Sequence, residues 1–410
     1  ENKLFRNEGG YFVDLSQAAG VAGPASDGGS SGNWSTASAW FDYDRNGWVD
    51  LFVCNYVRWT PDADLFTTLD GTTKSYATPE QYEGESCRLY ANRNGQRFED
   101  VSRQSGIHDP EGKSLGVAVS DFNDDGWPDI VVANDTEHNF LYMNQRDGSY
   151  ADVAVGSGVG YDEFGRARAG MGVDVAEIGE RGRESILIGN FSSEPLSLYT
   201  ELESGLFQDL AGQARLTGAS LLKLTFGATF VDLDLDGDLD IVTANGHIEP
   251  TVNDVQQNIT FAQEPQVFLN AGDGTFEDAA SALGDGFSRA VVGRGVAYGD
   301  IDRDGDPDIL ITVNGGRPLL LRNDFPSGSA NSIVLELSGQ PPNTGALGAV
   351  VTAFAGGRQQ RRMVRTGSSY LSQSDFGSLV FGLGEAESVD SIVVRWPSSL
   401  ESTTFQGVLA

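Results

Sequence analysis

The stretch VDLDLDGDLDIVTAN (residues 231–245) places acidic residues at alternate positions and then continues as an apolar, strand-like run. Three further stretches repeat it in the same register: FDYDRNGWVDLFVCN from 41, SDFNDDGWPDIVVAN from 120 and GDIDRDGDPDILITVN from 299. A fifth, VDVAEIGERGRESILIGN from 173, keeps the strand pattern and loses most of the acids. Self-similarity of this kind indicates a fold built from repeated units.

A second element recurs between the acidic stretches and has the pattern strand, glycine turn, strand. Its copies are LFRNEGGYFVDLS at 4, LYANRNGQRFEDVS at 89, LYMNQRDGSYADVA at 141, LYTELESGLFQDLA at 198 and VFLNAGDGTFEDAA at 267. Each unit is therefore a strand, an acidic loop, a strand, a long loop, a strand, a turn and a strand, which is typical of a β-propeller blade. The count predicts five blades, with the N-terminal hairpin completing the last blade and closing the ring, so that no sheet edge stays free.

The pattern changes after a Pro/Gly/Ser-rich joint near 322–332. The segments SIVLELSG, AVVTAFAGG, SLVFGLG and SIVVRWPSS are short alternating strands without acidic loops. We therefore expect an all-β chain, with a β-propeller over residues 1–325 and a small β-sandwich-like domain over residues 326–410. In the second domain, GGRQQRRMVRTG places Arg361 and Arg365 on one face of a strand and Arg362 on the other. This strand is either solvated or docked against the acidic propeller.

The four intact acidic loops share a ligand pattern that predicts calcium. Oxygen-bearing side chains occupy positions 1, 3, 5 and 9, glycine occupies position 6, and the backbone carbonyl of position 7 can join them. The predicted ligands are Asp42, Asp44, Asn46, Trp48 and Asp50; Asp121, Asn123, Asp125, Trp127 and Asp129; Asp232, Asp234, Asp236, Asp238 and Asp240; and Asp300, Asp302, Asp304, Asp306 and Asp308. Hard oxygen ligands in this number suit Ca²⁺ better than Mg²⁺, so about four calcium sites are expected.

The acidic loops are not EF-hands, and one copy of the repeat lacks the calcium-binding pattern. An EF-hand needs a bidentate Glu at position 12, where this chain has Val53, Val132, Thr243 and Ile311. The third copy has Asp174 followed by apolar residues, so we expect it to bind no metal.

The overall charge restricts the partners. The formal net charge of −32 at pH 7 argues against nucleic acid and anionic membrane surfaces, which would repel the chain. No apolar run approaches the ~20 residues that a membrane-spanning helix needs. The only two cysteines, Cys54 and Cys87, fit one disulfide in an oxidising compartment, although two free thiols are equally allowed. We expect a secreted, periplasmic or extracellular protein whose signal peptide has been removed.

The acidic loops followed by L-x-V-x-N strands resemble the FG-GAP/VCBS repeats of integrin α-chain propellers. The stretch from NTGALGAVV at 343 to VDSIVVRWPS at 398 resembles the ASPIC/UnbV domain. This pairing is similar to bacterial relatives of cartilage acidic protein and covers nearly the whole chain. The resemblance implies calcium-bound propeller loops and a binding role, and family members also occur with biosynthetic genes.

The long loops, which join the second and third strands of each blade, emerge at the opposite end of the sheets from the acidic loops. We call this end the long-loop face. It gathers basic, acidic and histidine residues, and loops of this kind carry function disproportionately. The ligand-binding candidates are Arg166, Arg168, Arg294 and Tyr56; if the protein is an enzyme, the catalytic candidates are Asp135, His138, His247 and Glu249. The alternative is that the arginines pair with loop carboxylates and that His247 caps a turn.

Two functions of different class follow. The first is a calcium-stabilised module that binds a protein, a glycan or a small polar ligand through the long-loop face. The second is an enzyme of secondary metabolism that uses the same face for acid/base chemistry, such as cyclisation, isomerisation or elimination, with calcium purely structural. No Walker, dinucleotide or zinc-protease signature is present, and the GGSSG at 28–32 lacks the strand-to-helix setting of a nucleophile elbow.

Overall fold

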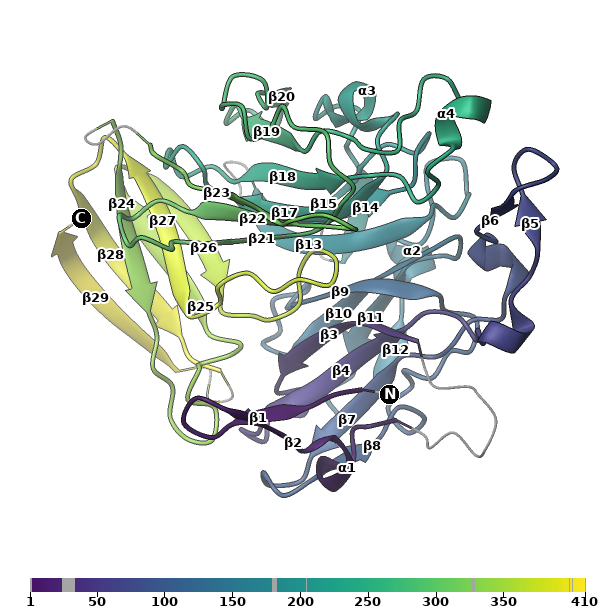
Figure 1. Ribbon diagram of the computed structural model, residues 1–410. Helices are drawn as coiled ribbons and strands as arrows, with labels where there is room; N and C mark the ends of the chain where they lie inside the picture. The colour runs from purple at the N-terminus through teal and green to yellow at the C-terminus, as the bar shows by residue number, and fades with distance from the viewer. Residues whose placement is uncertain are drawn as a thin grey trace.

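The computed structural model describes residues 2–23, 34–178, 183–203, 205–325, 329–397, 399 and 401–409. The chain is all-β, with a series of small sheets arranged side by side and a C-terminal pair of sheets at one end (Figure 1). The GGSSG motif at 28–32 lies outside the described residues.

Five antiparallel sheets follow one another in the order that the repeats predict. The first has the order β3-β4-β7-β8, the second β12-β11-β10-β9, the third β13-β14-β15-β16, the fourth β17-β18-β19-β20 and the fifth β21-β22-β23. Their strands are β3 Ser35–Phe41, β4 Asp50–Asn55, β7 Arg88–Asn92, β8 Phe98–Asp100; β9 Ser114–Ser120, β10 Asp129–Asn134, β11 Phe140–Asn144, β12 Tyr150–Asp152; β13 Gly170–Ile178, β14 Arg183–Asn190, β15 Ser197–Glu203, β16 Leu206–Asp209; β17 Thr225–Val231, β18 Asp240–Asn245, β19 Gln266–Asn270, β20 Phe276–Asp278; and β21 Gly293–Gly299, β22 Asp308–Val313, β23 Leu319–Leu321.

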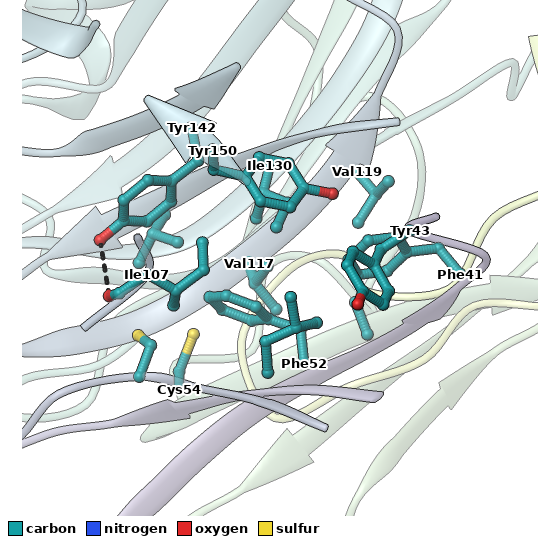
Figure 2. Close-up of a cluster of buried hydrophobic side chains, with 14 of the residues drawn as sticks. Phe41, Tyr43, Phe52, Cys54, Ile107, Val117, Val119, Ile130, Tyr142 and Tyr150 are labelled. Atoms are coloured by element: carbon teal, nitrogen blue, oxygen red, sulfur yellow. Dashed lines mark hydrogen bonds between the residues drawn. The ribbon is translucent and has the colours of Figure 1, made fainter. Parts of the chain in front are cut away.

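The apolar run after each acidic loop forms the second strand of a blade. In β4, β10 and β18 every residue is buried, because both faces of these sheets are covered, by neighbouring blades or, on the outer side of the first blade, by the N-terminal segment. Figure 2 shows the core between the first two blades, where Phe52, Val117 and Ile130 meet. At its edge the buried hydroxyl of Tyr142 donates to the carbonyl of Ile107 at 3.4 Å. Because both faces of these strands are buried, their sequences are continuous apolar runs and do not alternate between apolar and polar residues.

A recurring asparagine clasp lies at the other end of these blades, and it explains the Asn that ends the acidic repeats of the second and fourth blades. In the fourth blade the Asn245 Oδ1 accepts from Thr225 at 2.8 Å, while its Nδ2 donates to the carbonyl of Glu264 at 3.0 Å. The second blade has the same clasp, in which Asn134 accepts from Ser114 at 2.7 Å. Both asparagines are fully buried, so the clasp satisfies polar groups that have no access to water.

The closure expected from the N-terminal hairpin is not made by hydrogen bonding. Within the described chain, β1 (Phe5–Asn7) and β2 (Phe12–Asp14) pair only with each other, and the fifth sheet has three strands. The N-terminal segment instead covers the outer apolar surface of the first blade, where Leu4 and Val21 pack with Leu51. The two strands of the hairpin are themselves exposed, and the residues that bury this surface flank them, so the hairpin forms no hydrogen-bonded part of the fifth sheet.

A segment of the C-terminal domain lies where closure was expected. The Thr366 side chain bonds both backbone groups of Trp40 in β3, at 2.6 and 3.0 Å. Nine residues later, the Asp375 N–H donates to the carbonyl of Tyr298 in β21 at 3.0 Å. The segment therefore bridges the first and last inner strands, and Figure 1 shows it as a yellow loop that reaches toward β9 and β13.

The C-terminal domain consists of two packed sheets, as its alternating strands predict. One pairs β24 with β27, and the other has the order β26-β25-β28-β29. Their bounds are β24 Asn331–Glu336, β25 Val350–Ala355, β26 Arg358–Met363, β27 Ser378–Gly384, β28 Ser388–Arg395 and β29 Ser402–Leu409. Ile333 and Phe381 of the first sheet pack on Val351 and Ile392 of the second. The boundary predicted after residue 325 falls between β23 and β24 and stays a prediction.

The remaining elements are short. The long loop of the first blade carries a small hairpin and two 3₁₀ turns, and four single-turn helices lie in other loops. Their bounds are β5 Thr67–Thr68, β6 Lys74–Ser75, η1 Pro61–Ala63 and η2 Pro79–Gln81; and α1 Ser16–Ala19, α2 Ala154–Ser157, α3 Leu216–Ser220 and α4 Val252–Val255. Among the described residues, none of the helices has the length and apolar character needed to cross a membrane.

The two cysteines are buried free thiols, so the disulfide is not formed in this structure. Cys54 is the penultimate residue of β4, and Cys87 precedes β7. Burial raises the pKa of the Cys54 thiol. The Cys87 thiol donates to the Ser114 hydroxyl at 3.2 Å, so it shares its partner with the asparagine clasp of the second blade.

The asparagine clasp gives a direct stability test. Asn245→Ala should lower the free energy of unfolding by about 1–3 kcal/mol, because it leaves the buried Thr225 hydroxyl without its acceptor and the Glu264 carbonyl without its donor. The control is Asn314→Ala, since Asn314 follows the second strand of the fifth blade but is exposed, and this change should stay within about 0.5 kcal/mol. Urea unfolding measures both; equal losses would contradict the clasp.

Candidate functional site

The four intact acidic loops share one backbone conformation, and the glycine at position 6 makes it possible. This residue is left-handed in every copy: Gly47, Gly126, Gly237 and Gly305 have φ between 84° and 98°. Position 4 is left-handed as well, in Arg45, Asp124, Leu235 and Arg303, with φ between 54° and 64°. Residues with side chains enter this region reluctantly, so the loops carry local strain that their hydrogen bonds must offset.

The carboxylates at positions 1 and 9 fix that conformation. In the second loop, Asp121 accepts the N–H groups of Asp125 at 2.9 Å and Gly126 at 2.8 Å. Asp129 accepts from Phe122 at 3.0 Å and from Asn144, on the third strand, at 2.8 Å. Position 9 therefore ties each acidic loop to the next strand of its blade. The equivalent residues Asp50, Asp240 and Asp308 make the same pair of bonds.

Three of the loops bring enough carboxylates together to hold a metal ion. Their ligand oxygens lie within 4.8 Å of one another; the groups are Asp42, Asp44 and Asp50; Asp232, Asp234 and Asp240; and Asp300, Asp302 and Asp304. Asp232 is 3% exposed, and its Oδ1 has no hydrogen-bond partner among the described residues. A buried carboxylate oxygen without a donor, beside two further carboxylates, fits a bound cation.

Burial changes the protonation of these loops. It raises the pKa of Asp50, Asp129 and Asp240 to about 8, and it raises the pKa of Asp232 to about 7. The neighbouring carboxylates act in the same direction, because like charges disfavour ionisation. A cation held in the loop would reverse this effect, since it favours the charged form of each ligand.

The other predicted ligands have individual roles. Asn46, Asn123 and Asp236 accept N–H groups within their own loops. Trp48 and Trp127 occupy position 7, and the Arg45 guanidinium lies 5.0 Å from the Trp127 ring centroid. Asp238 pairs with Arg358 at 2.5 Å. Asp306 accepts the Phe325 N–H through Oδ2, and its Oδ1 is a second buried oxygen without a partner in the described part of the chain.

Arginines occupy the acidic loops that lack such a cluster. In the second loop, Arg395 pairs with Asp121 at 3.1 Å and Arg146 pairs with Asp125 at 2.9 Å. In the degenerate third copy, Arg365 pairs with Asp174 at 2.7 Å. A guanidinium thus neutralises the first acidic position in both loops.

The basic strand of the C-terminal domain is docked against the propeller and is not solvated. Arg361 of β26 pairs with Glu177 and also reaches Asp124 at 2.9 Å. Arg362 lies 5.4 Å above the Phe381 ring inside its own domain, where burial lowers its pKa and the Asp232 charge raises it. The C-terminal domain therefore covers the acidic-loop end of the propeller.

The opposite, long-loop face has an apolar centre with a few polar groups. Here the inner strands begin, and Leu115, Met171 and Phe226 form a cluster that Tyr56 and Tyr370 join. The Tyr56 hydroxyl donates to Asp135 Oδ2 at 2.6 Å. Burial raises the pKa of Asp135 to about 6. We call Tyr56, Asp135, Phe226, Arg294 and Tyr370 the axial site.

Arg294 is the cation of the axial site. Its guanidinium carbon lies 4.2 Å from the Phe226 ring centroid. Its N–H groups donate to the carbonyls of Gly246 at 2.9 Å, Gly293 at 2.7 Å and His247 at 3.3 Å. Among the residues that the structure describes, no carboxylate pairs with it, and burial lowers its pKa. A desolvated guanidinium without an acidic partner is unusual in a chain of net charge −32.

His247 and Glu249 lie beside the axial site. The His247 Nδ1 accepts the Glu249 N–H at 3.0 Å, and burial lowers the His247 pKa, so the ring is neutral. Its Nε2 is buried and has no hydrogen-bond partner within the described ranges. Glu249 accepts a hydrogen bond from Ser75, at the end of β6. The long loop of the first blade therefore crosses the face to reach the fourth blade.

The other sequence candidates lie elsewhere. His138 packs edge-on against Phe140 and lies 3.6 Å from Asp152, whose hydrogen bond raises the His138 pKa. Arg166 and Arg168 line a peripheral groove of about 460 Å³. Arg168 is held there by Asp209 at 3.0 Å, and Arg166 is exposed. The structure therefore brings together Tyr56, Asp135 and Arg294, with His247 and Glu249 nearby. His138, Arg166 and Arg168 lie elsewhere.

Sequence reasoning missed Phe226 and Tyr370. Phe226 lies within an apolar strand, where it resembles any core residue. Tyr370 belongs to the C-terminal domain, in the stretch TGSSYLSQS (366–374), which carries no repeat signal. The sequence signal that could have identified Tyr370 is a run of small residues around a single aromatic residue in an otherwise regular β-domain.

The metal clusters generate a prediction. Calcium should raise the melting temperature by several degrees, because ligand binding at 100 times Kd stabilises a site by about 2.7 kcal/mol. The combined variant Asp44→Asn, Asp234→Asn, Asp302→Asn removes one charge from each cluster and should lose most of that rise. In EDTA its melting temperature should equal or slightly exceed that of the wild type, because repulsion is relieved.

Calorimetry in calcium and in EDTA separates these effects. Asp285→Asn is the control, since Asp285 is exposed and lies outside the acidic loops. A wild-type calcium response in the triple variant would exclude the clusters as metal sites.

Comparison with known families agrees with the repeat pattern. Residues 339–409 match the model of the ASPIC and UnbV family, and residues 121–188 and 254–311 match that of the FG-GAP-like repeat. Cartilage acidic protein 1 from Homo sapiens is 24% identical over 305 residues, which is 73% of this chain and 43% of that protein. The Mus musculus protein gives 24% identity over 73% of this chain and 44% of its own. The chain thus spans less than half the length of the curated relatives it matches.

Solved structures show only loose similarity. The BP39L lectin from Burkholderia pseudomallei has a TM-score of 0.36 and 11% identity, with 92% of this chain and 100% of the lectin covered. A putative exo-β-1,3-galactanase from Bifidobacterium bifidum has a TM-score of 0.35 and 11% identity, with 74% and 96% covered. Scores this low assign neither a detailed fold nor a function.

Proposed function

We propose that the protein is a calcium-stabilised β-propeller module that binds a small anionic ligand at the axial site of its long-loop face. The observation that carries this proposal is Arg294, a partly buried guanidinium that is stacked on Phe226 and, among the residues that the structure describes, bonded only to backbone carbonyls. An anion that reaches this position gains a charge-assisted bond without displacing a protein carboxylate. The apolar cluster around it would bury the rest of a small ligand.

Calcium is the metal that suits the acidic loops best. Each intact loop offers more than three oxygen ligands in a flexible loop, whereas Mg²⁺ demands a tighter octahedral arrangement. The loops from 42, 232 and 300 provide the clusters, and the loop from 121 would take a fourth ion if Arg395 released Asp121. Sites of this kind fill at the millimolar calcium of extracellular fluids, which supports secretion.

The ligand is defined by a carboxylate or similar anion, which a metabolite, an acidic glycan or a protein partner could all present. A neutral glycan would make no use of Arg294. FG-GAP-like repeats favour a binding role, and the peripheral grooves on the same face leave room for a larger partner to extend beyond the axial site.

The Tyr56–Asp135 pair supports a second candidate, acid/base catalysis on the same ligand. A carboxyl group whose pKa is about 6 can exchange a proton near neutral pH, and Tyr56 orients it at 2.6 Å. If the protein is an enzyme, Asp135→Asn should abolish turnover while ligand binding persists.

The binding proposal predicts a charge-selective response. Benzoate should raise the melting temperature of the calcium-saturated protein, whereas benzamide, its neutral analogue of equal shape, should not. Arg294→Gln should lose the benzoate effect by at least about tenfold in Kd, because a charge-assisted bond contributes about 1.5–3 kcal/mol. Arg317→Gln is the control on the same face, since Arg317 is exposed. Equal benzoate affinity in both variants would refute the axial site.

The pH dependence follows from Asp135. Its raised pKa means that the carboxyl is neutral below about pH 6 and ionised above it. Benzoate affinity measured by calorimetry should therefore fall about three- to tenfold from about pH 5.5 to about 7.5, as a second negative charge develops in the site. Asp135→Asn should flatten this profile. A profile that stays unchanged in the variant would separate Asp135 from ligand binding.

A further inference from the structure

The C-terminal domain sends one segment through the centre of the propeller. This segment, residues 366–375, is called the plug segment below. It starts on Trp40 of the first blade and ends on Tyr298 of the fifth. Between these points Ser369 exchanges backbone hydrogen bonds with Val173 in β13, at 2.8 and 3.3 Å. The plug segment thus contacts the inner strands of three blades.

Glycines in the inner strands make room for it. A side chain at Gly295 would meet the Ser372 hydroxyl at 2.1 Å and the Tyr370 carbonyl at 2.7 Å. One at Gly172 would meet the Ser369 backbone at 3.0 Å, and one at Gly227 would meet the Ser369 hydroxyl at 3.1 Å. At Gly172 and Gly227 an added side chain would first meet the carbonyls of Phe226 at 2.3 Å and Arg294 at 2.6 Å, so these two glycines allow close packing of the inner strands as well as passage of the plug segment. At Gly295 the plug segment itself is the nearest neighbour.

The tip of the plug segment is strained in a way that presents Tyr370. The residues on either side of it, Ser369 and Leu371, are left-handed, with φ of 58° and 45°. Neither is a glycine, and such strain persists only where the surroundings enforce it. The turn directs Tyr370 onto Phe226, with ring centroids 4.9 Å apart.

The residues around Tyr370 belong to the long-loop face of the propeller. Burial raises its pKa, and the charges of Arg294 and Asp135 act on it in opposing directions, so both groups lie near the ring. Its hydroxyl makes no hydrogen bond to any described residue, and the side chain is only partly buried. An aromatic hydroxyl left free between two polar groups is available to a ligand.

We propose that Tyr370 is a ligand-binding residue, so that the ASPIC/UnbV-like domain completes the axial site from the far side of the propeller. The ligand class is a small planar carboxylic acid: its carboxylate pairs with Arg294, its planar part packs on Tyr370 and Phe226, and the Tyr370 hydroxyl donates to it. This inference rests on the proposed function. It adds that neither domain alone provides the site.

The test compares binding of benzoate and acetate to the full-length, calcium-saturated protein. Tyr370→Phe removes only the hydroxyl and should weaken benzoate about two- to tenfold, the value of one net hydrogen bond. Tyr370→Ala removes the ring and should reduce benzoate affinity to that of acetate. Tyr161→Phe is the control, since Tyr161 is exposed on the same face and makes no contact with the plug segment. Wild-type benzoate affinity in both Tyr370 variants would overturn the inference.

Arg294→Gln separates this outcome from failure of the proposed function. If the Arg294→Gln variant no longer binds benzoate and the Tyr370 variants still bind it, the binding proposal stands and the proposed role of Tyr370 is wrong. If the Arg294→Gln variant also binds benzoate as the wild type does, or if the wild type binds no benzoate, the proposed function is wrong.

A labelling experiment tests the placement of Tyr370 without any ligand. In the folded protein the Tyr370→Cys variant should react with a maleimide at least about tenfold faster than Val364→Cys, because Val364 is 2% exposed. The native thiols, Cys54 and Cys87, are buried and should stay unreacted. Equal protection of both introduced thiols would overturn the inference whatever the ligand.

Discussion

Repulsion between carboxylates is the constraint on which the rest of this structure depends. Four of the five blades turn at an intact acidic loop, so the repeated fold concentrates negative charge at one end of the propeller. Burial intensifies the problem, because it raises the pKa of Asp50, Asp129 and Asp240 to about 8. The protein offsets this charge in two ways: oxygen clusters suited to a cation in three loops, and guanidinium groups from the C-terminal domain at Asp121 and Asp174.

The second device connects the two domains mechanically. The arginines of β26 and its flanks hold the C-terminal domain over the acidic loops, and this position allows the plug segment to enter between the first and last inner strands. A propeller is usually closed by pairing strands of its first and last blades. Here a segment of the C-terminal domain bridges those blades, and the strained turn of this segment lies at the long-loop face.

The sequence predicted several features because they depend on local chemistry. Glycine at position 6 and acids at positions 1 and 9 specify the acidic loop wherever it occurs, so four copies in one register predicted the blades and the clusters. The structure differed from the sequence-based expectation where the partner of a residue lies far away along the chain. The N-terminal hairpin has the pattern of an outer strand pair, yet Leu4 and Val21 cover the first blade. His138 and Arg168 occur on the expected face, but Asp152 and Asp209 hold them away from its centre.

The amino-acid sequence by itself determined the repeat unit, the all-β class and the oxygen-rich loops, because each is set by interactions within a few residues or between adjacent strands. The tertiary structure decided which carboxylates face an arginine rather than a cluster, and that Tyr370 lies beside Arg294 rather than within its own domain. The physical reason is the sequence distance of these contacts. Arg365 meets Asp174 across 191 residues, and no periodicity records a pairing that only the docking of two folded domains creates.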